Sequence, residues 1–286
     1  MLTETREFTT EDFDYLRHGQ TALRTRLFRP QGRGPFPLVV DLHGGAWTAG
    51  DLEDSQARAE VMAAAGLAVA ALNFRHAGEG YPTSLVDINY AIRWLKARAD
   101  KLRLRAGAVG LSGNSSGGHL AMLAAMRPAE PRYAALELEE GARAVDARVR
   151  CVAMLWPVIN PLSRYRHALR LRGGANPPGW TANIPERHDL YWRTEENMAD
   201  GNPMLALERG EPVETPPALW IQGRPDEIHD YHDPESGGDL NEPERFAKNY
   251  RAAGGEIEVL YVEQAARATR ASFDPLAAFM RRHLLA

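Results

Sequence analysis

Two short motifs in this sequence combine glycine and serine in patterns suited to acyl-transfer chemistry. The first, "GLSGNSSGGHLA", places Ser115 at the centre of a Gly-x-Ser-x-Gly pattern over residues 113–117. A strand-like run precedes it and a small-residue helical run follows, which is the setting of a strand-to-helix turn tight enough to admit only small neighbours. We expect Ser115 to be an exposed nucleophile at a helix N-terminus, which stabilises developing negative charge. The alternative is an ordinary turn of glycine and serine.

The second motif is "DLHGGAW", residues 41–47, which follows the apolar run "PLVVDL". Its two glycines allow the backbone to turn N–H groups toward one point. We expect the N–H of Gly44 or Gly45, together with that of Ser116, to hold the oxyanion of a tetrahedral intermediate, and one such donor lowers the barrier by about 3 kcal/mol. Trp47 and Asn114 are candidates for substrate contact, and for Trp47 we favour packing beneath the loop over that contact.

The two motifs resemble those of the hormone-sensitive-lipase-like branch of the α/β-hydrolase family. The segments "NFRHAGEGYPTSLVDINYAIRWL" and "WIQGRPDE" extend the resemblance across residues 20–286. The resemblance implies an α/β-hydrolase fold, with a mostly parallel central sheet, helices on both faces and an inserted cap. It also implies hydrolysis of a carboxylic ester or related acyl compound, with Asp226 as the acid of a Ser–acid–His triad.

The position where this family keeps its triad histidine holds none. The histidine should follow the last strand, "EIEVLYV", but Arg267 stands there, and arginine stays protonated near neutral pH. Arg267 could pair with Asp226 or anchor a substrate carboxylate. His229 and His232, in the loop directly after Asp226, are the candidates for a replacement base. His229 comes first because it is nearer the sheet edge. The alternative is that both are solvated histidines.

These motifs leave three functional hypotheses open. The first is an active serine hydrolase with an atypical general base. The second is a non-catalytic ligand-binding protein, because the gibberellin receptor resembles the same branch, keeps the serine and lacks the triad histidine. The third is lyase-type or transferase-type chemistry that uses the oxyanion hole with a different proton shuttle, since a fold alone does not determine function.

The elements that must position these residues alternate along the chain. Apolar strand-like runs alternate with helical ones from about residue 37 onward, which predicts a parallel sheet covered on both faces. Residues 158–215, rich in Pro, Trp, Asn and Arg, are too long for a plain loop and predict an inserted cap. Residues 227–240 predict a long polar loop. Residues 1–18 precede the sheet, and we expect them to pack against it or to contribute to the cap.

The composition is that of a soluble globular protein. The 286 residues are 44% hydrophobic and 25% charged with a net charge of -4, which predicts one domain with an insertion and favours neither nucleic-acid nor membrane binding. The N-terminus has no apolar signal region, so we expect a cytoplasmic protein. The single cysteine, Cys151, lies in an apolar run and is expected to be packed.

We expect neither a metal nor another cofactor. The loop "DEIHDYHDPE" carries two histidines and several carboxylates, but no third histidine completes a ligand pattern. The expected partner is a small-molecule substrate, and the sequence leaves room for a homodimer.

Overall fold

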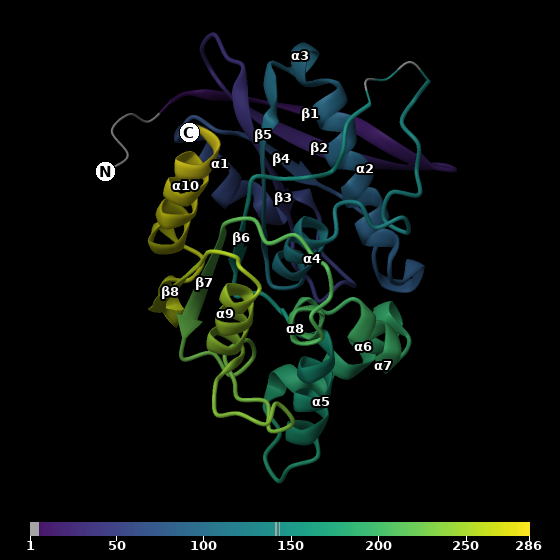
Figure 1. The fold of residues 1–286 in the computed structure, drawn as a ribbon, viewed down its shortest axis with the longest axis vertical. Helices are drawn as coiled ribbons and strands as arrows, with labels where there is room; N and C mark the ends of the chain where they lie inside the picture. The colour runs from purple at the N-terminus through teal and green to yellow at the C-terminus, as the bar shows by residue number, and fades with distance from the viewer. Residues whose placement is uncertain (1–5, 141, 143) are drawn as a thin grey trace.

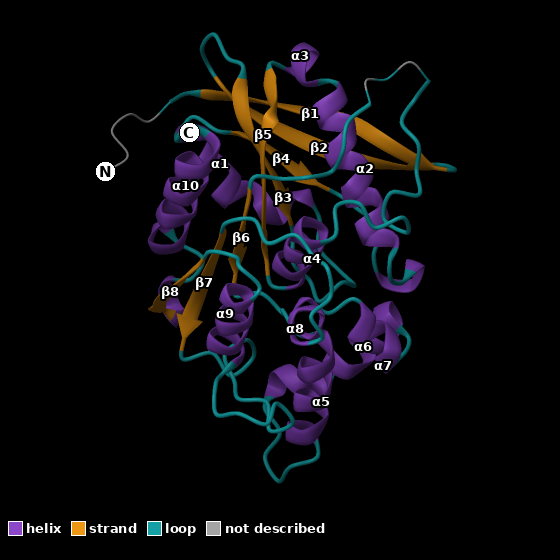
Figure 2. Ribbon diagram, viewed as in Figure 1, coloured by secondary structure: helices purple, strands orange, loops and turns teal. Residues whose placement is uncertain are grey.

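The computed structural model describes residues 6–140, 142 and 144–286, and the part of the N-terminal prediction that falls on residues 1–5 lies outside this range. The chain forms an eight-stranded sheet in the order β1-β2-β4-β3-β5-β6-β7-β8 (Figures 1 and 2). The strands are β1 Phe8–His18, β2 Thr21–Pro30, β3 Phe36–Leu42, β4 Ala68–Leu72, β5 Leu104–Asn114, β6 Cys151–Leu155, β7 Ala218–Arg224 and β8 Ile257–Glu263.

Strands β3 to β8 are parallel, as their uninterrupted apolar runs predict. Consecutive residues such as Val39 and Val40 are both fully buried because helices cover both faces. One face packs against α1 (Gln56–Ala64) and α10 (Arg270–Leu284), and Cys151 is buried on that side. The other face packs against α2 (Thr83–Ala97), α4 (Ser116–Met126) and α9 (Glu242–Ala252). The predicted α/β-hydrolase architecture is confirmed.

The N-terminal segment departs from the expected cap contribution. Residues 8–18 are the edge strand β1, which pairs antiparallel with β2 through a turn at Gly19, whose φ is +57°. In β2 the buried Leu23, Thr25 and Leu27 alternate with arginines that point away from the core. This alternation of period two is the sequence signal of a half-buried strand. Strands β1 and β2 therefore extend the sheet at its edge and do not cover the site.

The insertion between β6 and β7 is helical. Its elements are α5 Pro161–Arg172, α6 Ile184–Trp192, α7 Glu195–Asp200 and α8 Pro203–Glu208, with a short 3-10 helix at Gly179–Ala182. Figure 1 places these helices beyond the carboxyl ends of the strands, next to the long loop that follows β7. The remaining helix α3 (Ala99–Leu102) and the 3-10 helices at Leu52–Ser55, Ala77–Glu79 and Gln264–Ala266 lie in connections.

Candidate active site

Ser115 occupies the tight turn between β5 and α4. Its backbone has φ +51° and ψ −121°, a strained conformation for a non-glycine residue. A Cβ on Gly113 would lie 2.5 Å from the Gly117 carbonyl, and a Cβ on Gly117 would lie 2.3 Å from the carbonyl oxygens of Leu42 and His43. Both glycines of the motif are therefore required by close backbone approach, and the half-buried Ser115 stands at the N-terminus of α4 as the motif predicts.

The loop after β3 lies directly against this turn. A Cβ on Gly44 would lie 3.3 Å from the Ser115 Cβ and 2.9 Å from Nδ2 of the half-buried Asn114. Gly45 adopts φ +109°, which an L side chain rarely takes. Within the described part of the chain, the N–H groups of Gly44, Gly45 and Ser116 have no hydrogen-bond acceptor. Three free donors thus belong to segments that meet at the serine.

Trp47 packs beneath this loop in a buried aromatic cluster. The side chain is 1% exposed, and its Nε1 donates to Nδ1 of His119 at 3.2 Å. The rings of His119, His188 and Trp192 lie edge-on to the indole, with centroids 5.1–5.3 Å away. Nε2 of His119 donates in turn to the Gly201 carbonyl at 2.7 Å. Of the two roles considered for Trp47, packing beneath the loop is therefore the one present, and substrate contact is contradicted, because the buried indole joins the loop to α4 and the helical insertion.

The loop after β7 brings an acid and an imidazole to Ser115. Nε2 of His229 lies 3.4 Å from the Ser115 Oγ, and Nδ1 of the same ring lies 2.9 Å from Oδ2 of Asp226. A carboxylate only accepts hydrogen bonds, so Nδ1 carries the proton and Nε2 presents its lone pair to the serine hydroxyl. The separation from Ser115 is long for a hydrogen bond, as is common in a site without bound substrate.

Only three positions separate Asp226 and His229 in the chain, and the carboxylate itself closes the turn. Its Oδ1 accepts the N–H of Ile228 at 3.0 Å and that of His229 at 3.3 Å. Its Oδ2 also accepts Nε2 of Gln222 at 3.2 Å, a contact that sequence reasoning missed. Such local side-chain-to-backbone bonds are a recurrent property of aspartate. They turn the imidazole back over the acid that precedes it.

The environment sets both groups in the protonation states that general-base chemistry requires. Burial raises the pKa of Asp226, but the hydrogen bond and charge of His229, helped by Arg267, outweigh it and leave the pKa below its ordinary value. Burial lowers the pKa of His229, Asp226 raises it, and the charges of Arg164 and Arg267 lower it further. The net pKa of His229 is below its ordinary value, so its imidazole is neutral at pH 7 with Asp226 ionised.

Arg267 lies where the family histidine was expected and contacts the same acid. Its Nη1 is 3.2 Å from Oδ2 of Asp226, and its guanidinium stacks over the Trp156 ring, 4.9 Å from the centroid. Of the two uses considered for Arg267, pairing with Asp226 is therefore the contact present. His232 is not brought to the serine: its ring is exposed and bonds the Gly238 carbonyl. The structure therefore contradicts the expectation of His232 as a base.

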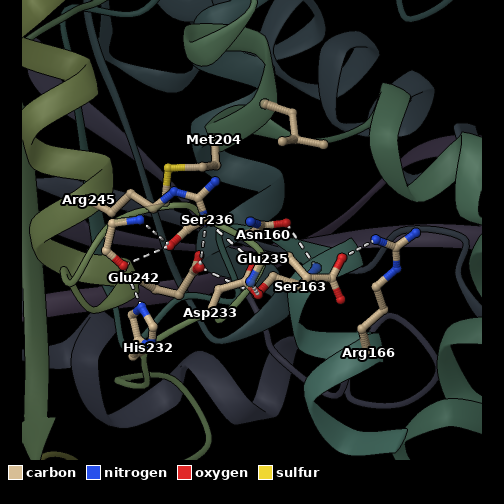
Figure 3. Close-up of polar contacts among 12 residues, drawn as sticks. Asn160, Ser163, Arg166, Met204, His232, Asp233, Glu235, Ser236, Glu242 and Arg245 are labelled. Atoms are coloured by element: carbon tan, nitrogen blue, oxygen red, sulfur yellow. Dashed lines mark hydrogen bonds and ion pairs between the residues drawn. The ribbon is translucent and has the colours of Figure 1, made fainter. Parts of the chain in front are cut away.

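Ion pairs tie the loop that carries His229 to α5 and α9 (Figure 3). Arg166 of α5 pairs with Glu235, and Arg245 of α9 lies 3.5 Å from Asp233. The isolated bridge between His232 and Asn241 closes the base of the loop. These contacts hold a long polar segment in one conformation, as a site residue on a loop requires.

Two further features bear on the class of site. In the ranges that the structure describes, no group of three or more His, Cys, Asp or Glu side chains is arranged to hold a metal ion. Across those same ranges, no helix is both long and apolar enough to cross a membrane.

Comparison with known proteins places the chain in a family. Residues 27–162 match the BD-FAE family model. The "Probable carboxylic ester hydrolase LipM" of Mycobacterium tuberculosis is 30% identical over 201 residues, which cover 68% of this chain and 42% of that protein. The gibberellin receptor GID1C of Arabidopsis thaliana is 25% identical over 289 residues, which cover 88% of this chain and 73% of the receptor.

Among solved structures, an esterase of Pyrobaculum calidifontis shares the fold with a TM-score of 0.72 at 20% identity, over 100% of this chain and 88% of that one. The chain belongs to the α/β-hydrolase superfamily, in the hormone-sensitive-lipase-like esterase branch that its motifs resemble. It spans less than half the length of the first mycobacterial relatives that it matches.

Proposed function

We propose that the chain is a serine hydrolase of carboxylic esters or related acyl compounds, with Ser115, His229 and Asp226 as its triad. One observation carries the proposal. A neutral imidazole lies 3.4 Å from the Ser115 hydroxyl and 2.9 Å from an ionised, buried carboxylate. Nucleophile, base and orienting acid thus follow one another in the order that serine hydrolysis requires.

In the proposed reaction, Oγ of Ser115 attacks the ester carbonyl carbon while Nε2 of His229 takes the hydroxyl proton. The free N–H groups of Gly44, Gly45 and Ser116 receive the developing oxyanion. His229 then donates its proton to the leaving alcohol as the C–O bond breaks and the acyl-enzyme forms. A water molecule, deprotonated by the same imidazole, hydrolyses the acyl-enzyme and restores Ser115. Asp226 keeps the ring in the required tautomer and stabilises the imidazolium.

Arg267 takes the place that the histidine of other family members would occupy, and we assign it a positioning role. It donates to Oδ2 of Asp226, the same oxygen that contacts His229, and its side chain is partly exposed. Its charge favours the ionised state of Asp226. In this arrangement the general base, His229, belongs to the segment after β7 and not to the segment after β8. The acid, Asp226, keeps the position that the resemblance to the family implies.

The test is release of p-nitrophenol from p-nitrophenyl acetate and butyrate by the wild type beside Ser115→Ala. We expect turnover that disappears in the variant while its thermal unfolding midpoint stays within a few degrees of the wild type. Equal rates for the two proteins would overturn the proposal.

The match to the gibberellin receptor favours a second candidate, a non-catalytic binding protein, because that alignment covers 88% of this chain. Saturable ligand binding that survives Ser115→Ala, without any ester turnover by the wild type, would support this candidate. The serine–imidazole contact favours the hydrolase, since binding alone does not require it.

A further inference from the structure

The side chain of Arg164, on α5, is a buried cation that forms no ion pair in the described part of the chain, and its guanidinium lies 5.8 Å from the centroid of the Trp180 ring. The residue is 4% exposed, and its Nε and Nη1 atoms have no hydrogen-bond acceptor in the described part of the chain. Its neighbours on α5 differ: Arg166 pairs with Glu195 and Glu235, and Arg172 pairs with Glu186. Arg164 therefore differs from Arg166 and Arg172, because it is buried and forms no ion pair within the described ranges, whereas they are more exposed and paired.

An unpaired buried charge is unfavourable, and proteins ordinarily pair it or neutralise it. Burial lowers the pKa of Arg164 to about 10, which still leaves the guanidinium protonated at neutral pH. The groups that favour its charge are Tyr231 and Asp226. Burial keeps the pKa of Tyr231 well above its ordinary value, so the phenol is neutral. The oxygens of Asp226 already accept His229, Gln222 and Arg267.

The location of this cation connects it to the triad. Arg164 and His229 line the same small cavity, together with Ile228, Tyr231 and Glu242. Burial raises the pKa of Glu242 to about 8, so its carboxyl is mainly neutral at pH 7. The charge of Arg164 also contributes to the low pKa of His229, after burial and the interactions with Asp226. Arg164 therefore lies beside His229 of the candidate active site and not in a separate part of the insertion.

Two other arginines contact the elements of the candidate active site. Arg187 of α6 donates to Oγ1 of Thr48 at 2.7 Å and to the Gly45 carbonyl at 3.0 Å, so it lies on the oxyanion loop. It is close enough to Arg164 to lower the pKa of that guanidinium. Arg267 is the third cation. Asp226 pairs with Arg267 and favours the charge of Arg164.

We propose that the substrate of this site carries a carboxylate, and that Arg164 binds it next to the scissile acyl group. The inference rests on the proposed function, because it names the substrate class of the same serine hydrolase site. A guanidinium is suited to a planar carboxylate through charge-assisted hydrogen bonds.

The test compares two matched pairs of esters. Mono-4-nitrophenyl glutarate and 4-nitrophenyl valerate carry the acid, or a methyl group in its place, on the acyl side. 4-Acetoxybenzoate and its methyl ester carry the acid, or a neutral methyl ester in its place, on the alcohol side. We expect the wild type to favour the acid in one pair by at least tenfold in kcat/KM, mainly through a lower KM, because a ground-state ion pair is formed on binding.

Arg164→Gln should remove that preference, losing at least tenfold more on the acid than on its neutral partner. Arg172→Gln is the matched control, since it removes the same charge from the same helix at a partly exposed site where the arginine is paired with Glu186. We expect the control to keep the wild-type ratio. Arg164→Gln should fold, because it removes a buried charge that forms no ion pair among the described residues. The urea midpoint of Arg164→Gln should equal or exceed that of the wild type.

Absence of a preference for the acid in both pairs, or equal losses on acid and neutral ester in Arg164→Gln, would overturn the inference. If the wild type hydrolyses no ester at all, the proposed function fails and calorimetric titration with glutarate decides the inference separately. Binding by the wild type that Arg164→Gln abolishes and Arg172→Gln keeps would support a carboxylate site. No binding by the wild type would overturn it.

Discussion

The substitution Arg267→Met tests the role assigned to the arginine that stands in the usual histidine position. Nη1 of Arg267 and Nδ1 of His229 lie 3.2 and 2.9 Å from the same oxygen of Asp226, so they are no more than about 6 Å apart. Two unit charges at this distance interact by about 2.8 kcal/mol at an effective dielectric constant of about 20 and by about 0.7 kcal/mol in water. The Arg267 side chain is 30% exposed, which favours an intermediate value.

An intermediate interaction of about 1.4 kcal/mol corresponds to a tenfold change in the protonation equilibrium of His229. Removing the cation makes protonation easier, because Arg267 is one of the groups that lower the pKa of His229. The acidic limb of the kcat/KM profile for p-nitrophenyl butyrate should therefore move to higher pH by about one unit. The plateau rate should fall by less than about tenfold, since Asp226 keeps its other donors.

The control for this experiment is Arg270→Met, which removes an exposed cation paired with Asp274 and should leave the profile unchanged. An acidic limb that stays in place in Arg267→Met, or that moves to lower pH, would refute the electrostatic reasoning. A changed KM for carboxylate-bearing esters, with an unmoved limb, would instead make Arg267 a substrate anchor.

Three further substitutions have expected outcomes. Asp226→Asn should lower kcat roughly 10³- to 10⁴-fold with little change in stability, because the ring loses its required tautomer; single-turnover acylation measures this, and a loss below tenfold would be contrary to the triad. Gly117→Ala should lower the free energy of unfolding by about 3 kcal/mol, measured in urea, since its Cβ would lie 2.3 Å from two carbonyl oxygens. Burial raises the pKa of Glu242 to about 8 despite Arg245 at 3.2 Å, so the neutral carboxyl stabilises the fold at low pH and this contribution is lost as pH rises toward 8. Glu242→Gln should then be more stable than the wild type at pH 9 but not at pH 4.5, and identical pH profiles would contradict the assignment.

The sequence predicted the parts of the site that depend on local backbone geometry. The turn at Ser115 and the loop at Gly44 and Gly45 require glycine for reasons that residue types alone express, because a side chain would collide with neighbouring backbone. The uninterrupted apolar strands likewise predict a sheet covered on both faces. The antiparallel strands β1 and β2 were missed, although the alternation of leucine and arginine in residues 23–27 carries their signal.

The parts that depend on tertiary contacts could not be predicted with the same certainty. His229 and His232 have similar sequence surroundings, and only the turn closed by Asp226 directs one ring to Ser115 and leaves the other exposed. The same holds for α5, where Arg164 and Arg166 are two positions apart. One is buried and forms no ion pair in the part of the chain that the structure describes, and the other pairs with two glutamates, a difference that depends on which face of the helix the rest of the fold covers.

The central claim, that the general base comes from the loop directly after the acid, is tested most directly by His229→Ala. The measurement is kcat/KM for p-nitrophenyl butyrate, beside His232→Ala as a control from the same loop, with both variants checked for native unfolding midpoints. The account predicts a loss of at least roughly 10³-fold for His229→Ala and a rate within twofold of the wild type for His232→Ala. Wild-type turnover in His229→Ala, with or without a loss in His232→Ala, would contradict the account.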